Sequence, residues 1–300
     1  MTFPVKTLKN GFSLPALGLG TWKMGGDRER DPANDDARDI TALKMAIDSG
    51  FTHIDTAESY AGGHAETLLG QAISGYDREK LVIATKVWPV NMGYDDLSSS
   101  LRGSLKRLNT DYVDLYYLHE ANHNIPFEET AKALNESYKE GLIKNVAVAN
   151  FLPQTFDKMQ ALLEMPIVAN QVHYNLMFRE PVIRGMLEHA VQNDYLLAAW
   201  RPIRFTSRNS QTPNANVWEK SAYPIIEEIA NNYNKTNIQI AINWLTSQPN
   251  VVTLAKSSNP VHLQELIGSI GWEMAQQDID RLAKEFPDQK TVSDSSVSLS

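Results

Sequence analysis

Four side chains that can carry proton-transfer chemistry follow three successive apolar runs of the sequence. Asp55 and Tyr60 come at the end of one run, Lys86 lies near the end of the next, and His119 ends the third. A tyrosine with an ordinary pKa of about 10 is a poor acid at neutral pH, but a neighbouring ammonium group lowers that pKa. A carboxylate would keep the ammonium charged, and an imidazole could donate to a carbonyl oxygen. Together they predict an acid that protonates oxygen as hydride reaches carbon, which is carbonyl reduction.

These side chains can act together only if the elements that carry them end at the same edge of the protein. A lone lysine or histidine at a strand end is more often structural than catalytic. Polar groups at three consecutive strand ends make coincidence a poor explanation. The order of elements along the chain therefore decides whether the four residues meet.

Short apolar runs alternate with amphipathic helical stretches over the whole chain. The runs are Ala16–Gly20, His53–Ala57, Leu81–Val87, Val113–His119, Asn145–Asn150, Val168–Val172, Leu196–Trp200 and Val251–Ala255. The helical stretches include Ala37–Ser49, Ala65–Ser74, Leu97–Leu108, Phe127–Glu140, Gln154–Leu163, Pro181–Gln192, Ala222–Tyr233, Pro260–Ile267 and Asp278–Phe286. Eight strand–helix units, spaced about 30 residues apart, predict parallel strands joined by crossover helices.

A closed barrel explains this pattern better than an open dinucleotide-binding sheet. The open fold favours GxGxxG after its first strand, and Gly18-Leu-Gly20 lacks the third glycine. Eight repeats in one undivided chain predict a (β/α)8 barrel, whose active site lies where the strands end. Asn10-Gly11 predicts an N-terminal β-hairpin. We expect one α/β barrel domain over residues 1–288 and a disordered tail over 289–300.

Composition narrows the function classes. The 300 residues include 28 basic and 36 acidic side chains, a net charge of −8. This argues against nucleic acid or an anionic membrane as partner, since both need a basic face. The absence of cysteine excludes disulfides, thiolate metal sites and a cysteine nucleophile. No secretory signal pattern and no run of 18 apolar residues is visible, so we expect a cytoplasmic enzyme.

Five segments give the chain a resemblance to a known family. They are Gly18–Trp22 (GLGTW), His53–Tyr60 (HIDTAESY), Ile83–Pro89 (IATKVWP), Leu108–His119 (LNTDYVDLYYLH) and Asn170–Asn175 (NQVHYN). In this order they resemble the aldo-keto reductases, from about Val5 to Pro287, in the microbial type with a short C-terminal loop. The resemblance implies a (β/α)8 barrel that reduces aldehydes or ketones with NAD(P)H. It also implies that Asp55, Tyr60, Lys86 and His119 are the catalytic tetrad, with Tyr60 as the acid.

The residues after the eighth run favour an anion. Asn259 and Pro260 predict a capped helix start, whose free N–H groups attract negative charge, and Lys256 adds a cation. An ordinary capped helix beside a solvated lysine is the alternative. The resemblance implies contacts to the adenosine phosphate end from Lys256, Ser257, Ser258, Asn259 and Glu265. It assigns the nicotinamide carboxamide to Asn150 and Gln171. Further cofactor contacts are expected from Thr21, Asp55, Trp200, Arg201, Ile203 and His262.

Several of these positions depart from the family pattern. His262 stands where an arginine commonly flanks the 2′-phosphate, which weakens a preference for NADPH without removing it. Trp200 stands where a tyrosine usually stacks on nicotinamide, and Arg201 where a small serine is common. Arg201 either reaches the pyrophosphate or occupies its space. Ala149 removes a frequent hydroxyl beside Asn150. We predict NADPH as the preferred cofactor, with NADH as a possible substitute.

The long polar loop of residues 204–217 has two interpretations. It is either a flap over the dinucleotide, with Arg204 and Arg208 near the phosphates, or a solvated insertion.

Aromatic residues near the strand ends predict the substrate pocket. We expect Trp22 and Trp88 as walls, with Phe127 as a third candidate, and His119 beside the carbonyl. Glu120, where many relatives have tryptophan, either faces the pocket and disfavours carboxylated aldehydes or points to solvent. The segment after the last helix is short, so we expect it to build none of the pocket. This leaves small aldehydes, dicarbonyls of the methylglyoxal type and open-chain sugars as substrates.

Two other functions remain open from the sequence. A barrel of the same family could sense its cofactor without turnover, and only an assay separates that case. A metal-dependent hydrolase is suggested weakly by His53 and Asp55 on one run, with His119 and His173 as further ligands. Lys86 and Tyr60 would then have no part, so we expect no metal. Monomer and dimer are both compatible with the sequence.

Overall fold

Eight parallel strands close into a barrel in this computed structural model, which describes residues 3–204, 217–287 and 289–300. Their order around the barrel is β3 (Leu17–Gly20), β4 (His53–Asp55), β5 (Val82–Val87), β6 (Leu115–Leu118), β7 (Val146–Ala149), β8 (Ile167–His173), β9 (Leu196–Trp200) and β10 (Val251–Ala255). β10 pairs with β3 and closes the ring, with Thr253 beside Leu17. The predicted (β/α)8 barrel is confirmed.

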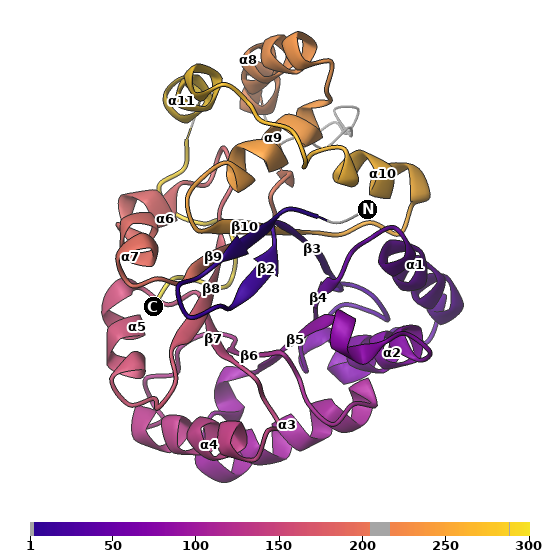
Figure 1. The fold of residues 1–300 in the computed structure, drawn as a ribbon, viewed down its shortest axis with the longest axis vertical. Helices are drawn as coiled ribbons and strands as arrows, with labels where there is room; N and C mark the ends of the chain where they lie inside the picture. The colour runs from indigo at the N-terminus through magenta and orange to yellow at the C-terminus, as the bar shows by residue number, and fades with distance from the viewer. Residues whose placement is uncertain (1–2, 205–216, 288) are drawn as a thin grey trace.

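A ring of helices surrounds these strands (Figure 1). They are α1 (Asp36–Asp48), α2 (His64–Ile73), α3 (Tyr94–Leu108), α4 (Phe127–Lys139), α5 (Pro153–Gln160), α6 (Glu180–Ile183), α7 (Met186–Gln192), α8 (Val217–Tyr233), α9 (Asn237–Thr246), α10 (Pro260–Ile267) and α11 (Gln276–Glu285). Because helices cover one face of every strand and side chains fill the barrel on the other, the strands are buried and mostly apolar. This is why they could be recognised as apolar runs in the sequence.

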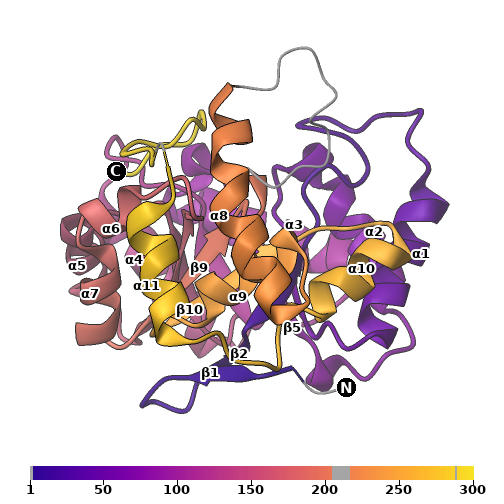
Figure 2. The ribbon, with the colours of Figure 1, turned by 90° about the horizontal axis from the view of Figure 1, so that it is seen from above.

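The N-terminal hairpin closes one end of the barrel. Strands β1 (Val5–Thr7) and β2 (Ser13–Pro15) pair in antiparallel fashion and lie below the other strands in Figure 2. Leu8 and Leu14 pack in the same apolar cluster as Leu115 and Ala198 from the barrel strands. The opposite end, where the strands finish, stays free for a site.

Two features of the helices differ from the sequence pattern. The stretch predicted over Pro181–Gln192 is divided into α6 and α7 by Gly185, whose φ of 68° lies in the left-handed region. Helix α9 was not predicted, because Ile240–Leu245 are all buried and no polar stripe marks a 3.6-residue period. Its start does carry a capping box, formed by Thr236 and Gln239.

The C-terminal segment, for which the sequence predicted disorder, makes main-chain contacts with the barrel. Phe178 pairs with Lys290, and the backbone of Ser300 forms hydrogen bonds with that of Asn150 and Leu152. These contacts are made by main-chain groups, which a polar side-chain composition does not reveal. No helix in the described ranges combines the length and apolar character needed to cross a bilayer.

Candidate active site

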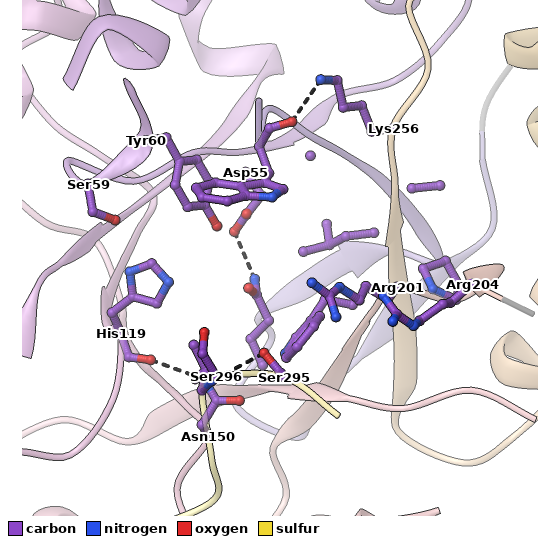
Figure 3. Close-up of a pocket in the computed structure, with 18 of the residues that line it drawn as sticks. Asp55, Ser59, Tyr60, His119, Asn150, Arg201, Arg204, Lys256, Ser295 and Ser296 are labelled. Carbon is purple, nitrogen blue, oxygen red and sulfur yellow. Dashed lines mark hydrogen bonds between the residues drawn. The ribbon is translucent and has the colours of Figure 1, made fainter. Parts of the chain in front are cut away.

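A cavity of about 670 Å³ opens at the carboxyl ends of the barrel strands. Asp55, His119 and Asn150 reach it from the ends of β4, β6 and β7, and Tyr60 from the short 3-10 turn after β4. Figure 3 shows Tyr60, Asp55 and His119 on one side, with Lys256, Arg201 and Arg204 on the other. The four residues whose types predicted proton transfer are therefore brought to one place.

Lys86 is completely buried, and its ammonium group has three oxygen atoms as hydrogen-bond partners. Its Nζ donates to Asp55 Oδ2 at 2.6 Å, to the Thr56 carbonyl at 2.7 Å and to Tyr60 Oη at 3.3 Å. Burial lowers the pKa of Lys86, but the charge of Asp55 and the interaction with the Tyr60 oxygen outweigh burial, so that the pKa lies above its ordinary value. The amine is thus a fixed ammonium group beside the phenol.

The second Asp55 oxygen is held by Gln171. Gln171 Nε2 donates to Asp55 Oδ1 at 2.8 Å. Both carboxylate oxygens therefore have a partner, which keeps the carboxylate aimed at Lys86. Gln171 therefore helps to position Asp55, a role that the sequence did not predict.

The Tyr60 pKa departs from the sequence argument. Enclosure of the phenol raises its pKa more than the Lys86 charge lowers it, so the net pKa lies above the ordinary value of 10.0. The predicted lowering is wrong, because desolvation of the phenolate exceeds the attraction of the ammonium. Tyr60 consequently holds its proton at neutral pH and can donate it.

His119 is a neutral imidazole at the same wall. Its ring makes edge contacts with Tyr60, at a centroid separation of 5.8 Å, and with Trp88, at 5.1 Å. Burial, aided by the Lys86 charge, holds its pKa well below 6.5. Asn150 Nδ2 donates to the His119 carbonyl at 3.1 Å, which fixes the strand end. A neutral ring retains one N–H that can donate to an oxygen in the cavity.

The predicted cap of α10 is present at the helix start where the resemblance implies the adenosine phosphate. Asn259 Oδ1 accepts from the Val261 N–H at 2.9 Å, and Pro260 is the first helical residue. Lys256 lines the cavity and donates to the Trp22 carbonyl at 2.7 Å. The cavity lining does not include the other predicted phosphate contacts, Ser257, Ser258, Asn259, His262 and Glu265. They lie on α10 and on the turn that leads into it.

Arg38 is a cation at this end that sequence reasoning missed. Its Nη2 lies 3.4 Å from Ser258 Oγ, although the two residues are 220 positions apart. Burial lowers the pKa of Lys256, and the charges of Lys23 and Arg38 lower it further against the opposing Asp39. Three cations therefore gather there. Arg38 lies near Ser258 because α1 packs against α10, and no local sequence pattern indicates that contact.

The Trp200 and Arg201 pair is tied to the C-terminal segment. Trp200 stacks on His173 at a centroid separation of 4.4 Å, and the Arg201 guanidinium carbon lies 5.1 Å from the Trp200 ring. Asp294 forms ion pairs with Arg201 and Arg204.

Two further residues expected to contact the cofactor are Ile203 and Thr21. Ile203 lines the cavity, while Thr21 has a completely buried hydroxyl without a partner in the described residues.

The C-terminal segment contributes directly to the cavity. Ser295, Ser296 and Val297 are among the residues that line it; Figure 3 shows the two serines next to Asn150. The expectation that this segment builds none of the pocket is therefore wrong. Its backbone pairing with Asn150 holds it across the strand ends.

The loop of residues 204–217, with Arg208, falls almost wholly outside the described residues.

Two of the three aromatic residues predicted for the substrate pocket line the cavity. Trp22 and Trp88 both line it, and Trp22 makes an edge contact with Tyr60 at 4.9 Å between centroids. Phe127 instead packs against the core and stacks on His123. Glu120 is half-buried, does not line the cavity and accepts from the Ser298 backbone N–H. The lining includes a residue that sequence reasoning passed over, Arg28, and its exposed position in a polar loop offered no signal.

His53 and His173, two of the candidate metal ligands, are both buried. Within the described residues neither ring nitrogen of His53 has a hydrogen-bond partner, and burial lowers its pKa to about 4. His173 pairs with Ser293, and burial lowers its pKa to about 3. Among the described residues no three His, Cys, Asp or Glu side chains come together as metal ligands. The geometry gives no support to a metal-dependent hydrolase.

This combination of a closed barrel and a Tyr–Lys–Asp–His cluster is that of the aldo-keto reductases, and the chain belongs to that family. The pattern of the aldo/keto reductase family matches residues 16–285. Among curated proteins, the methylglyoxal reductase YeaE of Escherichia coli (strain K12) is 33% identical over 284 residues, which covers 93% of each chain. A 9,11-endoperoxide prostaglandin H2 reductase of Trypanosoma cruzi (strain CL Brener) is 29% identical, over 92% of this chain and 89% of its own.

Solved structures show the same relation. The thermostable aldo-keto reductase Tm1743, in complex with the inhibitor epalrestat, superposes with a TM-score of 0.87 at 40% identity, covering 94% of this chain and 99% of its own. An aldo/keto reductase from Klebsiella pneumoniae in complex with NADP and acetate gives a TM-score of 0.80 at 28% identity, with 95% and 96% covered. The similarity spans the barrel and the site together.

Proposed function

We propose that this protein reduces small aldehydes and ketones to alcohols with NADPH, with Tyr60 as the proton donor. The observation that carries the proposal is the contact of the Tyr60 hydroxyl with the buried Lys86–Asp55 pair inside a cavity. The ammonium group of Lys86 attracts the phenolate that proton donation leaves behind, and it offsets part of the cost of burying that charge. The family and its NADP-bound neighbours support this chemistry.

The residues present fit a nicotinamide dinucleotide. One end of the site gathers Lys256, Lys23 and Arg38 beside the capped start of α10, which suits phosphate. The buried hydroxyl of Thr21 has no partner among the described residues, so it is available to a bound group. Asn150 and Gln171 lie at the cavity wall near Asp55 and His119, where we place the carboxamide. Bound NADPH supplies a hydride for the carbonyl carbon.

The protein's own groups handle the oxygen and the proton. The carbonyl oxygen lies between the Tyr60 hydroxyl and the His119 imidazole, which both donate to it. As negative charge develops on that oxygen, the Tyr60 proton moves to it, and the phenolate oxygen left behind faces Lys86 Nζ at 3.3 Å. Asp55 keeps the ammonium in place at 2.6 Å. Trp22 and Trp88 exclude water from the reacting side.

Arg38 supports a preference for NADPH over NADH. His262 lacks the permanent charge of an arginine, but Arg38 brings a guanidinium to the same turn from the neighbouring helix α1. A guanidinium pairs well with a phosphate group. We therefore assign the 2′-phosphate to the cluster of Lys256, Arg38 and Ser258.

Small carbonyl compounds fit the aromatic cavity. Methylglyoxal is the substrate named for the Escherichia coli relative, and we infer that dicarbonyls of this size are reduced here too. The Trp22 and Trp88 walls and the C-terminal residues leave a site suited to compact substrates.

The deciding experiment compares two tyrosine variants. Tyr60→Phe removes the proton donor, so kcat for a small aldehyde should fall at least about 100-fold while NADPH binding stays nearly unchanged. Tyr138→Phe, an exposed position on α4, is the matched control and should keep full activity. Retained turnover in Tyr60→Phe would contradict its role as the acid. Absence of turnover in the unaltered protein, across aldehydes and ketones with both cofactors, would favour the sensing alternative.

A further inference from the structure

Arg28 places a positive charge at the substrate side of the cavity. It lies in the loop that follows β3 and lines the cavity together with Trp22, Trp88 and His119. Its guanidinium carbon is 6.0 Å from the centre of the Trp88 ring. Trp88 in turn lies 5.1 Å from the His119 ring. The cation and the proposed carbonyl site are therefore separated by about one aromatic side chain.

Arg28 has no ion-pair partner within the described residues, unlike its neighbours in the loop. Lys23 pairs with Asp27, and Arg30 pairs with Asp36. Burial raises the pKa of the Glu120 carboxyl group and the charge of Arg28 acts to lower it, but the two side chains form no ion pair within the described residues.

The remaining cations at the cavity are already engaged with protein oxygens. Lys86 is held by Asp55, Lys256 by the Trp22 carbonyl, and both Arg201 and Arg204 by Asp294. Arg28 is thus the cavity cation, within the described ranges, whose charged head is left for a ligand.

We propose that Arg28 binds the carboxylate of the substrate, so that the enzyme favours aldehydes that carry a carboxylate about one ring-length from the carbonyl. This inference rests on the proposed function and adds the substrate class. A guanidinium group donates two parallel hydrogen bonds to a carboxylate, and Trp88 supplies the flat wall for the carbon skeleton between the two ends. Of the two alternatives that the sequence left for Glu120, repulsion of carboxylated aldehydes from within the pocket is not supported, because Glu120 does not line the cavity and accepts from the Ser298 N–H.

The test uses two aldehydes that differ in charge. 4-Carboxybenzaldehyde carries the carboxylate, and its methyl ester, methyl 4-formylbenzoate, has the same ring and a similarly electron-withdrawing group. The ratio of kcat/KM for the acid to that for the ester is measured with NADPH. In Arg28→Gln this ratio should fall about tenfold, mainly through KM, because a charge-assisted bond at a partly open site is lost. Arg30→Gln is the matched control and should keep the ratio of the unaltered protein.

The outcomes separate the two proposals. An unchanged ratio in Arg28→Gln, or an equal fall in Arg30→Gln, overturns the assignment of Arg28. An equal loss for both aldehydes also overturns it, because Arg28 would then only support the Trp88 wall. If the unaltered protein reduces neither aldehyde nor any other carbonyl compound with NADPH or NADH, the proposed function itself fails. Reduction of the ester with no dependence on Arg28 leaves that function intact.

Discussion

Replacement of Asp55 by asparagine isolates the buried charge pair on which the proposed mechanism depends. Lys86 is completely buried and lies 2.6 Å from Asp55. At an effective dielectric constant of 20, two unit charges at this distance attract by about 6 kcal/mol. Part of that attraction offsets the cost of burying the ions, and loss of one partner from such a pair typically costs about 3–5 kcal/mol. We expect the free energy of unfolding of Asp55→Asn to fall by that amount at pH 7.

The stability difference between Asp55→Asn and the unaltered protein should also depend on pH. In the unaltered protein the pKa of Lys86 is raised above 10.5, so the pair contributes stability below that pH and loses it as pH rises through the folded-state pKa. Without Asp55, burial dominates and the pKa of Lys86 falls below its ordinary value. In that variant, deprotonation of Lys86 as pH rises removes the free-energy cost of a buried, unpaired ammonium group. The difference in stability between the two proteins should therefore be smaller at pH 9.5 than at pH 7.

Urea unfolding at the two pH values, together with a pH–activity profile, is the assay. The alkaline fall in kcat should move to lower pH in Asp55→Asn, since Tyr60 loses its ammonium partner when Lys86 deprotonates. Asp114→Asn is the control, because Asp114 pairs with Arg78 at 2.7 Å and its side chain is only 13% exposed, but neither residue lines the cavity. It should lose stability without moving the profile. An Asp55→Asn variant with the same loss at both pH values and an unmoved profile would refute the reasoning.

Three further predictions test the cofactor site and the packing under the tetrad. Arg38→Gln should weaken NADPH binding about tenfold and leave NADH binding unchanged in a fluorescence titration, because only NADPH carries the 2′-phosphate; equal losses would contradict this. Asp294→Asn should tighten NADPH binding by releasing Arg201 and Arg204 for the phosphates, and weaker binding would show that Asp294 instead orients them. Gly18→Ala should lower the free energy of unfolding by about 1–3 kcal/mol, because its Cβ would lie 2.6 Å from His53 Nδ1 and 2.7 Å from Leu254 Cδ2. Gly20→Ala meets nothing within 4 Å and is the control for urea unfolding.

Much of the barrel could be predicted because its signals are local. Each strand is buried on both faces, so its residues are mostly apolar, and each of the eight runs overlaps a barrel strand of the structure. The cap at Asn259 and Pro260 depends on neighbouring residues alone, and it too is present. Helix α9 escaped prediction because it is enclosed by α8, α10 and the barrel, so no polar face marks it.

The tetrad follows from topology once the barrel is known. The carboxyl ends of parallel strands meet at one rim, so Asp55, Lys86 and His119 had to converge there. The pKa of Tyr60 did not follow, since the enclosure of its hydroxyl depends on Trp22 and His119 from distant parts of the chain. A sequence displays the charge of Lys86 but not the desolvation that opposes it.

The sequence by itself determined the barrel, its closed order and the identity of the four rim residues, because burial periodicity and strand-end position are properties of short segments. Tertiary structure alone decided which charges meet. Arg38 reaches Ser258 through helix packing, Asp294 reaches Arg201 through the C-terminal segment, and Arg28 reaches Trp88 through the fold of a surface loop. Long-range electrostatic pairs depend on positions that are distant in sequence, and no local pattern encodes them.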